Sequence, residues 1–162
     1  MLGNLSLPEH CKVVAATAGS VTTNGGVTFD HVMLRDVNRA WIVAMFLQAA
    51  SHATTIQPVV GATDGGCTTS ITFSARWWKN ADISTTDTLT AQTAGTSMAC
   101  DAGTTNQILV IEIDPADVAA QSSTYDWLGG TIATSGESTD YVTAFYVLDM
   151  RYKQAATPAV IA

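Results

Sequence analysis

Charged residues are scarce in this chain, and basic residues are the scarcest. Only 13% of the 162 residues are charged, and seven Lys and Arg stand against fourteen Asp and Glu, which gives a formal net charge of −7. Proteins that bind DNA, RNA or anionic membranes carry basic patches, which neutralise phosphates or lipid headgroups. The seven basic residues are instead scattered along the chain. We therefore expect neither nucleic acid nor a membrane as a partner.

Cysteines and long apolar runs are also few. Cys11, Cys67 and Cys100 show no CxxC spacing, and an odd number leaves at least one thiol unpaired. The longest apolar run, residues 40–50, is shorter than the roughly 20 residues that a membrane helix needs. The first twelve residues lack the basic and apolar regions of a secretory signal. These features predict small buried thiols in a protein that folds in a reducing cytoplasm.

Motifs that carry catalysis are missing as well. His10, His31 and His52 are far apart in sequence and are expected in loops or at the surface. No GxSxG elbow, P-loop, GxGxxG or EF-hand pattern occurs. Glu112 shares a predicted strand face with apolar residues. We expect a barrel-edge or hydrogen-bonded carboxylate there, with a buried Glu112 near Arg35 or Arg151 as the less favoured alternative. We predict no enzymatic activity, no cofactor and no metal site.

Hydrophobic residues are abundant in the chain and lie in short segments. Hydrophobic residues make up 47% of the sequence, and Thr, Ser, Ala and Gly fill most of the rest. About nine short strands separated by turns predict an all-β, single-domain β-sandwich or jelly roll. We expect this domain to span residues 10–152, between an N-terminal arm at 1–9 and a C-terminal arm at 153–162.

Two segments are distinctive within this pattern. Residues 38–49 are continuously apolar, which fits either a central strand covered on both faces or a buried helix; their Trp, Ile, Val and Phe favour the strand. Asn24-Gly25-Gly26 predicts a tight hairpin inside residues 20–29. The predicted strands are residues 11–18, 20–29, 38–49, 54–60, 67–79, 87–93, 96–100, 107–113, 125–134 and 140–152.

One short helical turn is expected near residues 114–121. Asp114 can cap its first turn, and Pro115 suits the first helical position. Asp117 then lies where an acid interacts favourably with the helix N-terminus.

Two adjacent tryptophans, Trp77 and Trp78, lie in the sequence SARWWKNAD at residues 74–82. In a strand, Trp77 and Trp78 must point to opposite faces. Counting by two places Trp77 in the apolar row that contains Ile71, whereas Trp78 falls in a polar row with Thr72 and Arg76. We therefore assign Trp77 to the core, and Trp78 to a surface that a loop or another chain covers.

Several short motifs occur in an order that resembles a family of structural proteins from tailed-bacteriophage heads. They are VMLRDVNRAWIVAMFLQ at 32–48, WKN at 78–80, TDTLT at 86–90, VIEID at 110–114 before PADV, YVL at 146–148 and RY at 151–152. The resemblance covers residues 37–162 and implies a decoration, cement or minor capsid protein without catalytic residues. Its expected partner is the major capsid protein.

This resemblance and the composition together predict a cement protein on the exterior of the virion head, assembled in the bacterial cytoplasm as a homo-oligomer, with a trimer as the expected form. An acidic body fits the outside of a shell that holds DNA. The candidate contact residues are Trp78, Arg76 and Lys79 on the predicted polar strand face, and Leu5, Leu7, Pro8, Pro158, Val160 and Ile161 in the arms.

Two other functions stay open on the sequence. One is a different virion role, as a tail or head–tail connector subunit. The other is a carbohydrate-binding attachment module, in which an exposed tryptophan such as Trp78 stacks on a sugar.

Overall fold

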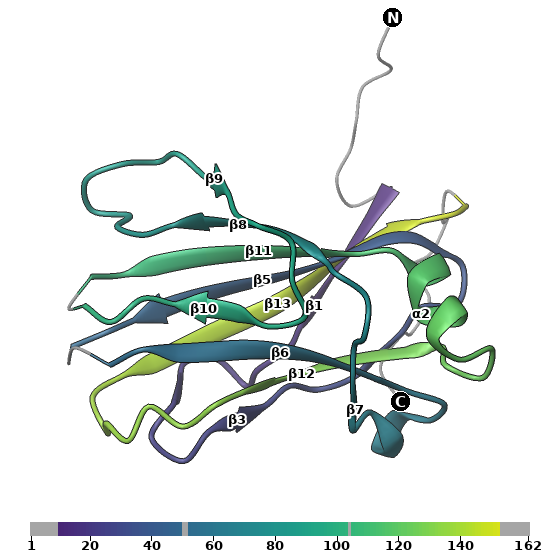
Figure 1. The fold of residues 1–162 in the computed structure, drawn as a ribbon, viewed down its shortest axis with the longest axis horizontal. Coiled ribbons are helices and arrows are strands. Elements are labelled where there is room, and N and C mark those ends of the chain that lie inside the picture. Colours follow the sequence, from purple (N-terminus) through teal and green to yellow (C-terminus); the bar gives the residue numbers. More distant parts are fainter. Residues whose placement is uncertain (1–9, 50–51, 104, 153–162) are drawn as a thin grey trace, which may run out of the picture.

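The computed structural model describes residues 10–49, 52–103 and 105–152. In this part of the chain, thirteen strands form two antiparallel sheets, and one short α-helix lies at an end of the sandwich (Figure 1). The predicted all-β sandwich is confirmed. No helix in the described ranges is long and apolar enough to cross a bilayer.

The larger sheet contains the longest strands. Its order is β1-β13-β5-β11-β8-β9, with β2 paired to β13. These strands are β1 (Cys11–Ala15), β2 (Val21–Thr22), β5 (Val37–Leu47), β8 (Arg76–Asn80), β9 (Thr90–Ala91), β11 (Gln107–Ile113) and β13 (Tyr141–Met150). The apolar segment at 38–49 is thus the strand β5 and not a helix, and it lies between β13 and β11.

The smaller sheet faces the larger one across the core. Its order is β10-β6-β12-β3, with β4 paired to β12 and β7 paired to β6. These strands are β3 (Val27–Thr28), β4 (Val32–Met33), β6 (Thr54–Gly61), β7 (Thr69–Ser70), β10 (Met98–Cys100) and β12 (Trp127–Ile132).

One main core fills the space between the sheets. Strand residues alternate between the two faces of a sheet, so every second residue of each long strand points inward. Ile42 of β5, Ile56 of β6 and Leu128 of β12 are all fully buried in this cluster. The inward row of β5 also includes two alanines, Ala40 and Ala44, which let the opposite sheet approach closely.

The predicted helical turn is confirmed as α2 (Pro115–Gln121). Asp114 caps it by accepting a hydrogen bond from the backbone N–H of Ala116 at 2.9 Å. Pro115 occupies the first position, Asp117 lies in the first turn, and Val118 anchors the helix in the core.

Two local predictions are wrong. The turn at Asn24-Gly25-Gly26 forms, with Gly26 at φ +80° and its N–H donating to Thr23 O, but it joins β2 of one sheet to β3 of the other and makes no hairpin. Residues 67–79 are two strands of different sheets, β7 and β8, joined by a crossing segment. Such short strands explain why thirteen are present and only about nine were predicted.

Candidate functional site

The outward side of the larger sheet is apolar over most of its width. Residues paired across antiparallel strands point to the same face. Val43 of β5 pairs with Val110 of β11 on one side and with Phe145 of β13 on the other. Val110 pairs in turn with Trp78 of β8. A row of large apolar side chains therefore crosses four neighbouring strands.

Neighbouring rows continue the same surface, which we call the outer sheet face. Within the described part of the chain, every one of its side chains is partly or largely exposed, up to 55% for Val13. It is formed by Val13 of β1, Trp41, Val43, Met45 and Leu47 of β5, Trp78 of β8, Ile108 and Val110 of β11, and Phe145 and Val147 of β13.

The structure resolves the roles of the two tryptophans. Trp77 is 8% exposed, belongs to the core cluster, and donates its indole N–H to Thr93 O at 2.9 Å, as its predicted core position requires. Trp78 lies on the opposite side, as predicted, but its surroundings are not polar. Its pairing partner Val110 and the strands beyond make that face apolar, which the sequence of β8 alone does not show.

The three predicted contact residues of β8 do not share a face. The guanidinium of Arg76 lies 5.8 Å from the ring centroid of Trp78, so these two residues are together on the outer sheet face. Lys79 belongs to the Trp77 side, because it is two residues away from Trp77. Its ammonium lies 5.8 Å from the Trp77 ring and 2.6 Å from the carboxylate of Asp101. The placement of Lys79 beside Trp78 is therefore wrong.

The other predicted contact residues lie outside the described residues. They are Leu5, Leu7 and Pro8 of the expected N-terminal arm, and Pro158, Val160 and Ile161 of the expected C-terminal arm.

A charged cluster occupies one end of the outer sheet face. The side chain of Glu112 is 11% exposed and is bridged by Arg39 at 2.5 Å and by Arg76. It also accepts a hydrogen bond from the indole of Trp41 at 3.3 Å. Glu112 is therefore a hydrogen-bonded carboxylate, as expected, whereas Arg35 pairs with Asp126 and is not its partner. Arg39 lies on β5 and Arg76 on β8, the two strands on either side of β11, although both are far from Glu112 in sequence.

Burial by itself raises the pKa of Glu112, but the hydrogen bonds and charges of Arg76 and Arg39 outweigh burial and lower the pKa below its usual value. A carboxylate with a lowered pKa in the folded state stabilises the fold above its unfolded-state pKa, which is about 4.3. This contribution is lost as the pH falls through the lower folded-state pKa.

We therefore expect Glu112→Gln to destabilise the protein by about 1–2 kcal/mol at pH 7, where the charged hydrogen bonds are intact. The difference from the wild type should shrink as the pH falls below the unfolded-state pKa of about 4.3, because the charged carboxylate then stabilises the fold less. Urea unfolding of both proteins at pH 7, 5 and 3 measures this. A difference that stays constant across that range would show that the charge of Glu112 contributes nothing.

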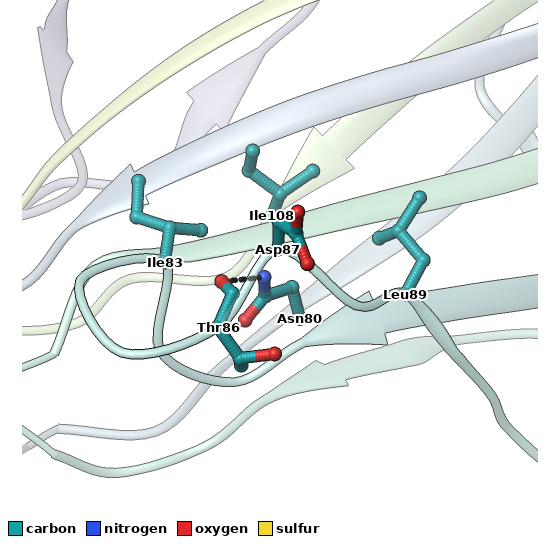
Figure 2. A pocket seen from close by; sticks show the side chains of 6 residues that line it. All are labelled: Asn80, Ile83, Thr86, Asp87, Leu89 and Ile108. Carbon is teal, nitrogen blue, oxygen red and sulfur yellow. Dashed lines mark hydrogen bonds between the residues drawn. The ribbon is translucent and has the colours of Figure 1, made fainter.

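An open hollow of about 250 Å³ adjoins the outer sheet face on the β8–β11 side. Ile108 and Asn80 form its floor, and the segment after β8 supplies its rim (Figure 2). The side-chain amide of Asn80 donates to Thr86 O at 2.7 Å, which holds this segment in place. The lining residues are Asn80, Ile83, Thr86, Asp87, Leu89 and Ile108. The hollow therefore extends the apolar surface at this corner.

The outward side of the smaller sheet is different, because the chain covers it locally. A second buried cluster there joins Val59, Cys67 and Trp127, with Met33 packed against it. Burial raises the pKa of the Cys67 thiol to about 12, with the nearby charges of Asp64 and Asp126 as smaller causes. All three cysteines are free, as predicted, and Cys67 and Cys100 are buried whereas Cys11 is partly exposed.

Groups of side chains that are typical of metal or catalytic sites are few among the described residues. Among those residues, no group of three or more His, Cys, Asp and Glu side chains is placed to hold a metal ion. His31 contacts Asp64 and packs over Gly129, where a Cβ would lie 2.5 Å from the imidazole Cδ2. His52, in another loop, is near Glu137 at 3.7 Å. The outer sheet face is therefore the strongest candidate site.

No known protein family and no curated protein matches the chain. Among solved structures, the chain is similar to the SPBc2 prophage-derived protein YomS, with a TM-score of 0.47 and 10% identity over 85% of this chain and 91% of the other. It is also similar to a putative sugar binding protein from Bacteroides thetaiotaomicron VPI-5482, with a TM-score of 0.33 and 10% identity over 76% of this chain and 65% of the other. These likenesses are distant, and one of the two proteins is prophage-derived.

Proposed function

We propose that this chain is a non-enzymatic virion structural protein, a decoration or cement protein that binds the exterior of a phage head. Its partner is the major capsid protein, and it acts as a homo-oligomer, with a trimer at the three-fold positions of the shell. It assembles in the cytoplasm of the bacterial host. The observation that carries the proposal is the outer sheet face, which has the chemistry of a protein–protein interface.

Shape and composition support assembly over catalysis. Small-molecule sites are concave and enclose their ligand, whereas the outer sheet face is one side of a continuous sheet, presented by strands β1, β13, β5, β11 and β8. Trp41, Met45 and Phe145 on this face belong to the residue types enriched in the buried centres of interfaces. A contiguous exposed apolar surface of this kind marks an interaction site.

Four of the segments that resemble phage head proteins also lie on this sheet. WKN lies on β8, VIEI on β11, YVL on β13, and AWIVAMFL on β5. The sheet order places these strands side by side, as β13-β5-β11-β8. These four segments are far apart in sequence but form one continuous part of the sheet. An architecture shared with the phage head proteins would require such a common structural unit.

The charge of the chain supports a position outside the shell. A net charge of −7 would be repelled by packaged DNA in the interior. On the exterior, each subunit stabilises the head by adding contact area across neighbouring capsid subunits, and a stable interface buries on the order of 1,200–2,000 Å².

The proposal is tested by adding the purified protein to heads that lack it. We expect co-sedimentation with the heads, hundreds of copies per particle, and a higher temperature of head disruption. About a dozen copies at one vertex would indicate a connector instead. Equal heat resistance with and without bound protein would contradict a cement role. Glycan binding that Trp78→Ala abolishes would indicate an attachment module.

A further inference from the structure

We infer that the outer sheet face is the surface through which copies of this chain bind each other, with the faces of the copies packed together around a symmetry axis. The inference rests on the proposed function and names the partner of one surface. The same sheet would then carry the homo-oligomer, and other surfaces would remain available to the capsid shell.

The first argument is that the long strands are apolar on both faces. In β5, the outward residues Trp41, Val43 and Met45 are apolar, and so are the inward residues Ala40, Ile42 and Ala44. β13 likewise turns Phe145 and Val147 outward. Strands that are apolar on both faces are typical of sheets covered on both sides. The smaller sheet covers only the inner side.

The second argument is the contrast between the two sheets. On the smaller sheet, residues 61–67 fold back over the outward cluster, so closely that a Cβ on Gly61 would lie 2.2 Å from the carbonyl oxygen of Gly66. Trp127 is therefore only 7% exposed. On the larger sheet, loop residues Ile83 to Leu89 shield one corner around Asn80 and Ile108, and the centre around Val43 keeps partly exposed side chains throughout the described ranges.

The third argument is the size of the surface. Five strands spaced about 4.8 Å apart, with about seven residues each at 3.3 Å, present roughly 550 Å² of flat sheet. Side-chain relief increases the accessible area beyond this projection. A standard stable interface takes about 800 Å² from each partner. Two such faces together present roughly 1,100 Å² before side-chain relief, which exceeds the roughly 1,000 Å² total that a specific interface requires. Sheets pack face to face at about 10 Å.

The fourth argument, for a second copy over an unrelated partner, is the distribution of charge. Near a symmetry axis, a residue meets its own copy, so a charged side chain there would face a like charge. The centre of the face holds Val43, Val110 and Phe145, all uncharged. The charged residues of the face, Arg39, Arg76, Glu112 and Asp149, lie at one end, and Glu112 pairs with both arginines. The uncharged centre of the face is therefore the place where two chains of net charge −7 can approach each other with the least repulsion.

The test is the molar mass of the full-length protein by size-exclusion chromatography with light scattering. We expect wild-type protein at two or three times 17.0 kDa. Val110→Lys places a charge at the centre of the face and should shift the mass to that of one chain. Val13→Lys makes the same change at a strand edge that is already 55% exposed, where the monomer accommodates a lysine readily, and should weaken association.

Thr131→Lys is the matched control. Thr131 is a partly exposed residue of β12 in the smaller sheet, where it pairs with Thr28 and Gln57. The same charge at this position should leave the mass of the wild type unchanged. Circular dichroism and the unfolding temperature establish that each variant is folded.

Two outcomes would overturn the inference. One is a monomeric wild type, as when the face is covered by the chain itself. The other is a pair of folded variants, Val110→Lys and Val13→Lys, that both keep the wild-type mass. A monomer that still co-sediments with heads would refute this inference alone. An oligomer that does not bind heads would refute the decoration function alone.

Discussion

Replacing Trp77 by alanine is expected to lower the free energy of unfolding by about 3–5 kcal/mol, because the truncation removes a large buried ring and leaves a cavity. Trp77 is 8% exposed and pairs across the sheet with Ile111, which is fully buried. Its indole N–H also donates to Thr93 O, and this acceptor would lose its partner. Urea unfolding at pH 7, at two protein concentrations to separate folding from association, measures the change.

Trp78→Ala is the matched control, since it makes the same truncation one residue further along the same strand. Trp78 lies on the outer sheet face beneath Arg76. We expect Trp78→Ala to cost much less in the concentration-independent part of the unfolding free energy and to weaken self-association. If both variants lost equal stability at every concentration, Trp78 would be a core residue and the outer sheet face would be covered within one chain.

Replacing Gly61 by alanine is expected to destabilise the protein by about 2–3 kcal/mol through overpacking. A Cβ at this position would lie 2.2 Å from the carbonyl oxygen of Gly66 and 2.8 Å from the backbone N of Cys67. These are backbone atoms, so no rotamer change relieves the clash, and residues 62–67 must move away from β6. This movement would uncover the cluster that contains Cys67 and Trp127.

The thiol of Cys67 reports this movement directly. In the wild type, Cys67 is 3% exposed and burial raises its pKa to about 12, so the thiol is protected from alkylation. Gly61→Ala should speed its modification at pH 8, read site by site by mass spectrometry. Gly65→Ala is the control in the same loop, because a Cβ there meets nothing within 4 Å. Equal labelling rates in both variants would contradict the clash.

The elements that the sequence predicted well are those with a strong local pattern. Strand β11 has the predicted bounds, Gln107–Ile113, because five of its seven residues are apolar and polar residues, Asn106 and Asp114, flank it. Helix α2 follows from a capping Asp114 and a Pro115 at the first position. β5 was correctly assigned to a strand over a helix on the basis of its β-branched and aromatic residues.

The elements that the sequence missed depend on distant partners. Strand β4 is two residues long, and so short a segment has no periodicity. Val32 is in a strand because it pairs with Leu128, 96 residues later. The charged cluster was missed for the same reason, since Arg39, Arg76 and Glu112 become neighbours only when β5, β8 and β11 align.

The sequence by itself determined the class of fold and the two-residue alternation that sends Trp77 and Trp78 to opposite sides of a sheet. It could not say which side the second sheet would cover, because β5 and β13 are apolar on both faces and hydrophobic burial has no direction of its own. The tertiary structure decided this by packing the smaller sheet against the face that carries Ala40 and Ala44, where close approach is possible. The face around Val43, Val110 and Trp78 was left outward, as the surface available for assembly.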